Sequence, residues 1–452
     1  MMFFEKYKSH YKEILKLGIP IVIGQLGVII VGFADNIMVG QYDSVHLAAA
    51  SFVNSVFNVP ILFGLGFAYG LTPLVGQAFG RGDTSKVGQY LKNSLMVNFF
   101  IGVFLSLVMG VLYANLDKLG QPAELLPIIR PYFLLQLFSL IFVMLFNAFK
   151  QFSDGITDTL TPMFVMLAAN LFNIVGNYIL IYGKLGLPDM GLTGAGISTL
   201  ASRVLMLVAF AIIFSHKKQF KPYFKVYKHI ECNRKDALEL NRMGWMVGIQ
   251  MGLETALFSV AGVMIGWLGT ASLAAHQTLA TVSTLGFMMY YGIGAAISVR
   301  VSNYFGRDDM INLRKTVTAG FHIIVLLAIG ASSIFFLGRN LIGPIFTASI
   351  EVHQIVVTLI PILLLYQIGD AIQITFANSL RGIGDVNSMA IISVIGYIFI
   401  ALPLCYICGF IFDWGIQGIW IGFPVGLITA GVLFCLRFYY KIGFSTNNNT
   451  LS

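Results

Sequence analysis

Residues 18–40 of the chain read GIPIVIGQLGVIIVGFADNIMVG, and residues 244–266 read GWMVGIQMGLETALFSVAGVMIG. Each stretch is 23 residues long, is predominantly apolar, and begins and ends with glycine. A helix needs about 20 predominantly apolar residues to cross the hydrocarbon core of a bilayer. The two stretches therefore predict two membrane-spanning helices, and their glycines at equal spacing indicate that the chain repeats itself.

The repeat extends well beyond these two stretches. A shift of 226 positions gives 14 identities in 66 pairs over residues 18–83, and it places Phe79–Arg81 on the identical run Phe305–Arg307. Further along, Gly155 matches Gly382, so the register has changed by one position. Such a slip is typical of an ancient duplication followed by a small insertion. We therefore expect two halves of the same topology, related by a pseudo-two-fold axis along the membrane normal.

Composition excludes a soluble protein. Hydrophobic residues make up 57% of the 452 residues and charged residues 11%, whereas soluble domains carry about 25% charged residues. Twelve apolar segments are expected, near residues 14–41, 47–72, 92–115, 127–150, 161–183, 192–215, 244–268, 273–299, 316–338, 354–380, 388–411 and 415–440. The prediction is an all-α integral membrane protein of two six-helix bundles. Its parts are an N-terminal lobe (1–215), a basic connector (216–243) and a C-terminal lobe (244–452).

The basic residues lie mainly in the gaps between apolar segments. With twelve spans both termini share one face, and 23 of the 28 Lys and Arg residues fall on that face. Eight of them lie in the connector. Because Lys and Arg concentrate on the cytoplasmic side of membrane proteins, both termini are predicted to be cytoplasmic. The net charge of +8 is thus explained by topology, and no nucleic-acid partner is expected.

Two carboxylates within the second half are candidates for a coupling site. Glu254 and Asp370 each lie about 15 Å from the cytoplasmic end of their helices, given a rise of about 1.5 Å per residue. Tyr366 precedes Asp370 by four residues, so its hydroxyl projects from the same helix face. A carboxylate inside a bilayer is a functional candidate by default. Two carboxylates and a hydroxyl suit either a hard cation with oxygen ligands or a coupled proton site. Na⁺ is the candidate cation at Glu254 and Asp370.

A second candidate site lies in the first half. Asp35 stands near the outer end of the first apolar segment, and Asn173 and Asn177 are one helical turn apart in the fifth. They are expected in the outer half of one lobe, where they form a proton, cation or substrate site or, alternatively, only hold helices together. Arg203 in the sixth segment is either a structural counter-charge or a substrate contact, and the sequence leaves this open.

Enzyme chemistry is not expected, so no catalytic residue is assigned. The seven histidines form no metal-ligand spacing, and the chain contains no Gly-x-x-x-x-Gly-Lys-Ser/Thr loop for ATP phosphates. No intramembrane nucleophile stands with a base. A channel is the less favoured reading because a two-lobed duplication shows no obvious filter. An exporter is the leading hypothesis, and no cofactor beyond a coupling ion is expected.

Several runs of the sequence resemble the multidrug and toxic compound extrusion (MATE) transporters, and the resemblance covers nearly the whole chain. The runs are GIP at 18–20, GFADNIMVG at 32–40, QAFG at 77–80 and LRGIGD at 380–385. Within that family the chain is similar to the NorM branch, whose cation site is implied at Glu254, Asp370 and Tyr366. In the DinF-like branch an aspartate is expected in place of Asn177.

The resemblance implies an antiporter that exports organic cationic drugs in exchange for Na⁺ or H⁺ by alternating access. It favours Na⁺ modestly and leaves H⁺, or both ions, open. A bacterial inner-membrane protein, monomeric and surrounded by lipid, is expected. The alternative within the wider superfamily is a flippase for lipid-linked oligosaccharides. Such flippases often have extra helices and a basic cavity, whereas this chain has twelve spans and only Arg203 as an intramembrane base.

Overall fold

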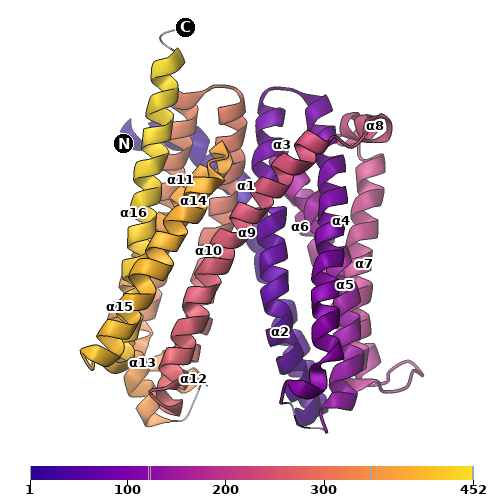
Figure 1. Ribbon diagram of the computed structural model, residues 1–452, viewed down its shortest axis with the longest axis vertical. Coiled ribbons are helices and arrows are strands. Elements are labelled where there is room, and N and C mark those ends of the chain that lie inside the picture. The colour runs from indigo at the N-terminus through magenta and orange to yellow at the C-terminus, as the bar shows by residue number, and fades with distance from the viewer. Residues whose placement is uncertain (1, 121, 123, 347–348, 450–452) are drawn as a thin grey trace. The chain divides into compact units, whose positions relative to one another are not determined.

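The computed structural model describes residues 2–120, 122, 124–346 and 349–449, and its regular elements are helices (Figure 1). Within these residues, twelve helices are long and apolar enough to cross a membrane. The predicted all-α fold with twelve membrane-spanning helices is therefore confirmed, and the protein is a multi-pass membrane protein.

The helices are α1 (Met2–Tyr42), α2 (Ser44–Ala68), α3 (Leu71–Gly80), α4 (Thr84–Ala114), η1 (Leu116–Lys118), α5 (Leu126–Gly155), α6 (Leu160–Ile181), α7 (Gly191–His216), α8 (Lys221–His229), α9 (Arg234–Gly266), α10 (Thr270–Gly306), α11 (Met310–Leu337), α12 (Arg339–Phe346), α13 (Ile350–Ile383), α14 (Val386–Ser393), η2 (Val394–Ala401), α15 (Leu402–Tyr406), η3 (Ile407–Ile411) and α16 (Gly415–Asn449).

The helices form two compact units. The continuous unit is Ile23–Gly248, and the two-part unit combines Met1–Val22 with Ile249–Ser452. Helices α1 and α9 therefore each contribute to both units. The two crossing points, 22/23 and 248/249, are equivalent under the shift of 226 residues. The compact units do not coincide with the predicted lobes 1–215 and 244–452, whose boundaries stay a prediction.

Polar and close packing contacts explain why the start of α1 belongs to the two-part unit. The guanidinium of Arg300 in α10 pairs with the Glu13 carboxylate, and His10 Nδ1 lies 3.1 Å from Thr316 Oγ1 in α11. Further along α1, a Cβ on Gly292 would lie 2.9 Å from the backbone nitrogen of Val22. The absence of a side chain at Gly292 thus lets α1 and α10 touch.

The duplication is visible in the local geometry of the two units. Asp83 Oδ1 accepts a hydrogen bond from the backbone N–H of Lys86 at 2.9 Å, and so caps the start of α4. Asp309, 226 positions later, accepts from the backbone N–H of Asn312 at 3.0 Å and caps α11 in the same way. Each aspartate satisfies an N–H group that has no partner within its helix. The sequence repeat is therefore also a repeat of helix boundaries.

The matching glycines Gly155 and Gly382 occupy equivalent tight contacts. A Cβ on Gly155 would lie 2.7 Å from Val75 Cγ1, and one on Gly382 would lie 2.7 Å from Val301 Cγ1. Val75 and Val301 are themselves partners under the shift of 226 residues. The same helix contact, α5 on α3 and α13 on α10, is thus built twice from the same residue types.

This contact leads to a stability prediction. Gly155→Ala and Gly382→Ala are each expected to lower the free energy of unfolding by about 1–3 kcal/mol, because a methyl group overpacks the contact. Thermal unfolding of the purified protein in detergent measures the change. Gly252→Ala is the matched control, since a Cβ there meets no atom within 4 Å. A midpoint lowered equally by Gly252→Ala would contradict the packing explanation.

The span expected near 47–72 is present within Ser44–Gly80, and it contains a turn. The helix ends at Ala68, Tyr69 and Gly70 form a turn, and α3 continues from Leu71. Pro73 explains the interruption, because it has no N–H to donate to the carbonyl four residues earlier. In the second half Val299 stands at the equivalent position, and α10 runs unbroken from Thr270 to Gly306.

The segment expected near 388–411 is present as the span Val386–Ile411, and its helical geometry changes along its length. It consists of α14, the π-helical stretch η2, α15 and a second π-helical stretch η3. π-Helical turns occur frequently at functional sites. Here η2 carries Tyr397, which is fully buried and reaches the acidic cluster described below.

Candidate functional site

The acidic cluster of the two-part unit is formed by α9, α10, α13 and η2. Asp370 in α13 is only 1% exposed. Among the residues that the structure describes, neither of its carboxylate oxygens has a hydrogen-bond partner. The Asp370 carboxyl interacts electrostatically with that of Glu254 in α9. The predicted pair of acids is therefore brought together.

Two glutamines hold the carboxylate of Glu254. Gln250, one turn earlier in α9, donates from Nε2 to Glu254 Oε2 at 3.1 Å. Gln373 in α13 donates to the same oxygen at 3.2 Å and to the hydroxyl oxygen of Tyr397 at 2.9 Å. Gln250 Oε1 in turn accepts from the buried guanidinium of Arg381 at 3.3 Å. Glu254 is thus oriented from both α9 and α13.

Tyrosine hydroxyls complete the polar surroundings of Asp370. Tyr366 is 7% exposed, and its hydroxyl interacts electrostatically with both Asp370 and Glu254. Tyr290 in α10 is fully buried and also interacts with Asp370. Tyr290 OH has no hydrogen-bond partner within the described part of the chain, and the same holds for both amide atoms of Gln367.

The chemistry of this cluster is that of a site for a small hard cation or a proton. Its ligating groups are carboxylate, amide and hydroxyl oxygens, which Na⁺ and similar hard cations prefer over nitrogen or sulfur. Over the described residues, no group of three or more His, Cys, Asp or Glu side chains gathers that would hold a metal ion. Two carboxylates supported by neutral oxygens suit a weakly held, exchangeable ion better than a permanent metal.

The amide cluster of the continuous unit contains the residues predicted in the first half. Asn177 in α6 donates from Nδ2 to Asp35 Oδ1 in α1. With its amide turned to satisfy both of its polar atoms, Asn173 also donates to Asp35 Oδ1, at 3.0 Å, and accepts from the backbone N–H of Thr199 in α7. Asn173 and Asn177 are 2% and 0% exposed. Asp35 is therefore held by two buried amides.

Arg203 in α7 lies beside the amide cluster. Its Nη1 donates to Gln136 Oε1 in α5 at 2.9 Å and to the Ser139 hydroxyl. Gln136 Nε2 then donates to the hydroxyl oxygen of Tyr132 at 3.0 Å. Arg203 also interacts electrostatically with Asp35. The structure thus places a positive charge, held by polar groups of α5, next to the acid of the continuous unit.

One pair of acids that repeats in both halves has a different environment from the acids of the two clusters. Asp158 pairs with Lys217 at 2.6 Å, and its partner in the repeat, Asp385, pairs with Arg437 at 2.6 Å. Glu254 and Asp370 correspond instead to apolar residues of the first half, Val28 and Val143, and Asp35 corresponds to Ala261 in the second. This repeated pair serves the fold through ion pairs. The acids of the two clusters have no acidic counterpart in the other half.

Several residues of the acidic cluster were not predicted. Gln250 and Gln373 lie four residues before Glu254 and three after Asp370, so helical spacing alone was a usable signal for both. Buried amides in an apolar segment also need partners. Tyr290 and Tyr397 had no comparable signal, because they belong to separate helices within long apolar runs.

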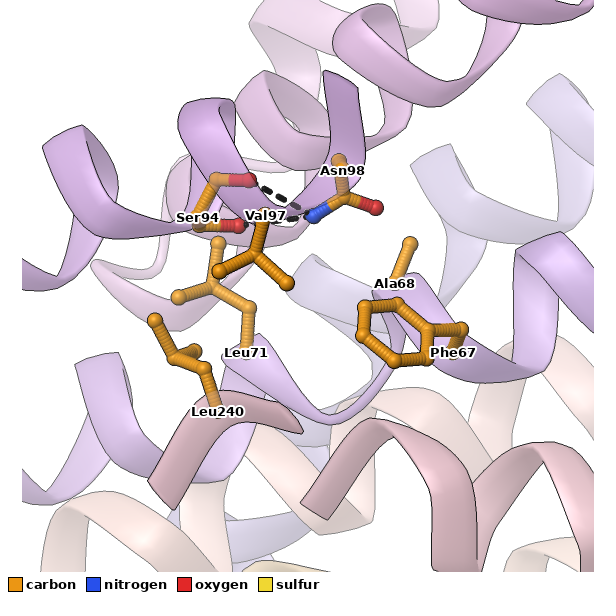
Figure 2. A pocket seen from close by; sticks show the side chains of 7 residues that line it. All are labelled: Phe67, Ala68, Leu71, Ser94, Val97, Asn98 and Leu240. Carbon is orange, nitrogen blue, oxygen red and sulfur yellow. Dashed lines mark hydrogen bonds between the residues drawn. The ribbon is translucent and has the colours of Figure 1, made fainter. Parts of the chain in front are cut away.

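A small pocket of the continuous unit, lined by residues of neither cluster, lies at the turn between α2 and α3 (Figure 2). Asn98 Nδ2 donates to the Ser94 carbonyl at 2.9 Å and to its hydroxyl at 3.0 Å. The remaining lining is apolar. It consists of Phe67, Ala68, Leu71, Val97 and Leu240. This lining resembles helix packing at a bend, and we assign it no chemistry.

Comparison with known proteins identifies a family model, MatE, that matches residues 20–179 and 247–407. The two matched stretches lie one in each half of the repeat. Together they cover more than half of the chain.

Curated relatives and solved structures agree with this match. The chain is 30% identical to the probable multidrug resistance protein NorM of Bradyrhizobium diazoefficiens, over 95% of this chain and 93% of the relative. It is 29% identical to the multidrug resistance protein NorM of Photobacterium profundum, over 95% of each chain. It superposes on an outward-facing multidrug resistance MATE family transporter with a TM-score of 0.87, at 19% identity and with 97% of both chains covered. At that identity the structural likeness shows the fold alone.

Proposed function

The chain belongs to the MatE family, and from this premise we propose that it is a multidrug efflux transporter that exchanges organic cations for Na⁺ or H⁺. The curated relatives named multidrug resistance proteins support the substrate class. Antiport and cation coupling are supported by the chemistry of the two clusters. We further propose alternating access as the transport cycle and a bacterial inner membrane as its location, with both termini cytoplasmic and the protein monomeric.

The observation that carries the proposal is the state of Asp370. A carboxyl group that is 1% exposed and has no hydrogen-bond partner within the described residues is costly to bury as an anion. It is relieved when it binds a proton or a metal cation. Glu254 beside it adds a second negative charge and makes that demand stronger. The pair therefore attracts one cation, which is the function of a coupling site.

A coupling ion drives transport only if it binds the two end states of the protein with different affinity. Glu254 and Asp370 lie on different helices, α9 and α13, so their separation is sensitive to helix movement. The ion holds the two carboxyls together, and any state that moves them apart loses affinity for it. Binding of the ion thereby selects one state of the cycle, and binding of the drug selects another.

The helices α1 and α9 support alternating access, because each belongs to both compact units. Movement of one unit relative to the other is transmitted through the segments at residues 22/23 and 248/249. Pro20 lies close to the first of these and lacks the N–H that would donate to the carbonyl four residues earlier. Because this hydrogen bond is already missing, α1 can bend near Pro20 with fewer backbone hydrogen bonds to break.

We assign the amide cluster a separate role in the same cycle. Asp35 is held by Asn173 and Asn177 and faces the charge of Arg203. A carboxylate already satisfied by amides and by a nearby cation is a weaker cation ligand than Asp370. It is better suited to exchange a proton or the charged group of a substrate. The two clusters therefore need not bind the same ion.

Transport with the two gradients imposed separately tests the proposal. We expect proteoliposomes that contain the protein to move ethidium when either a Na⁺ gradient or a pH gradient is applied at zero membrane potential. Protein-free liposomes are the control. If neither gradient changes the rate of ethidium movement, cation-coupled antiport is wrong.

A further inference from the structure

The connector between the two halves forms a short helix, α8, at the rim of the continuous unit. Figure 1 shows α8 beside α4 and the C-terminal end of α7, and both helices contact it. Phe220, just before α8, is 0% exposed, and Tyr223 is 8% exposed. Lys92 of α4 donates from Nζ to the carbonyls of Tyr227 at 3.2 Å and Ile230 at 2.6 Å. One side of α8 is therefore fastened to the membrane-spanning helices.

The opposite side of α8 carries three lysines. Lys221, Lys225 and Lys228 are all exposed. Their spacing of four and three residues places them on one face of the helix, turned away from Tyr223 and the packed side. We call these three residues the lysine face of α8. Lys218, just before the helix, is also exposed and adds to the same charge.

The acidic residues near α8 are mostly directed away from this face. Asp236, 3% exposed, pairs with Lys86 of α4 at 2.7 Å. Glu239 accepts a hydrogen bond from Tyr90 OH at 3.0 Å. Glu239 and, after the end of α8, Glu231 are both exposed. Asp236 and Glu239 thus each bond a side chain of α4, whereas the lysines of α8 are exposed.

We propose that the lysine face of α8 binds the phosphate groups of anionic lipids in the leaflet that α8 borders. An amphipathic helix with lysines on its polar face lies at the level of the headgroups when its apolar side is anchored to the bilayer or to membrane-spanning helices. Here the aromatic anchors are Phe220 and Tyr223. The three lysines are exposed, and the Lys228 ammonium, which lies 4.7 Å from the centre of the Phe224 ring, stays at the surface where lipid phosphates can reach it. A juxtamembrane basic cluster of this kind is typical of anionic-lipid recognition.

The consequence is a link between lipid charge and the position of α4. Lys92 of α4 is bonded to two carbonyls at the end of α8. Anionic lipids that hold α8 at the interface therefore also hold the end of α4. This inference concerns the connector alone and does not depend on which ion drives transport.

Native mass spectrometry of the full-length protein, titrated with phosphatidylglycerol or phosphatidylcholine, tests the proposal. We expect a preference for phosphatidylglycerol that the triple variant Lys221→Gln, Lys225→Gln, Lys228→Gln weakens at least about tenfold, because each lysine near an anionic surface contributes substantially to the attraction. The corresponding triple Arg variant keeps the positive charge and is expected to keep the preference.

Matched substitutions at Lys8, Lys12 and Lys16 are the control. These three lysines are also exposed, so the substitutions remove the same charge from another helix, and the phosphatidylglycerol preference is expected to persist. Unchanged preference in the α8 Gln variant would overturn the proposal. So would equal loss in the control variant, which would indicate an effect of net charge alone. Displacement of the lipid by inorganic phosphate at matched ionic strength would assign the face to a soluble anion instead.

Discussion

Asp370→Asn and Glu254→Gln are each expected to reduce gradient-driven ethidium efflux at least about tenfold, which corresponds to about 1.4 kcal/mol of lost coupling free energy. Asn and Gln keep the size and polarity of the side chains, so the helices remain packed. What disappears is the negative charge that binds the ion. Without differential binding of the ion, its gradient no longer biases the transport cycle. Efflux is measured in proteoliposomes under Na⁺ and pH gradients applied one at a time.

The control for this prediction is Asp117→Asn. Its side chain is 59% exposed and pairs with the exposed Arg130, so the substitution removes an exposed carboxylate that belongs to neither cluster. Ethidium binding in the absence of gradients is expected to survive in both cluster variants, which separates loss of coupling from loss of the drug site. Unchanged gradient-driven efflux in both variants would show that the acidic cluster is not the coupling site.

Membrane spans and the duplication could be predicted because they depend on local composition and on spacing. An apolar run long enough to cross the bilayer has one stable solution, a helix that satisfies its own backbone. Matching positions such as Asp83 and Asp309 were visible as identities in the shifted sequence, and the structure shows why they are retained: each caps a helix.

The interruption between α2 and α3 could not be predicted in the same way. Hydropathy continues through Tyr69 and Gly70, and a proline such as Pro73 ends some helices and only bends others. The outcome depends on neighbours distant in sequence. A Cβ on Gly70 would lie 2.6 Å from the backbone nitrogen of Gly244 in α9. The turn therefore depends on a close approach to α9, which the local sequence pattern does not indicate.

The candidate site was predictable to the extent that charge is expensive in a membrane. Asp370 and Glu254 were identified because a buried carboxylate needs a reason. Neutral residues carry a weaker signal. Tyr397 lies in the π-helical stretch η2, and its hydroxyl accepts a hydrogen bond from Gln373. Neither fact follows from an apolar run.

Asp35→Asn is expected to lower ethidium efflux about tenfold, again about 1.4 kcal/mol, and also to reduce thermal stability. The first effect follows from the loss of an exchangeable carboxyl group between Asn173 and Asn177. The second follows because the positive charge of Arg203 loses the acid with which it interacts. Efflux and the unfolding midpoint are measured on the same preparations, so the two effects can be compared directly.

The double variant Asp35→Asn with Arg203→Gln separates the roles of the two residues. If Arg203 is a counter-charge for Asp35, removing both charges restores stability. The double-mutant cycle of unfolding free energies then shows a coupling free energy of about 0.5–3 kcal/mol, as interacting pairs do. Efflux is expected to remain low, because the exchangeable carboxyl is still missing. If Arg203 contacts the substrate instead, Arg203→Gln alone weakens ethidium binding and the two losses add. Restored efflux in the double variant would show that Asp35 only balances the charge of Arg203, and the amide cluster would then have no part in coupling.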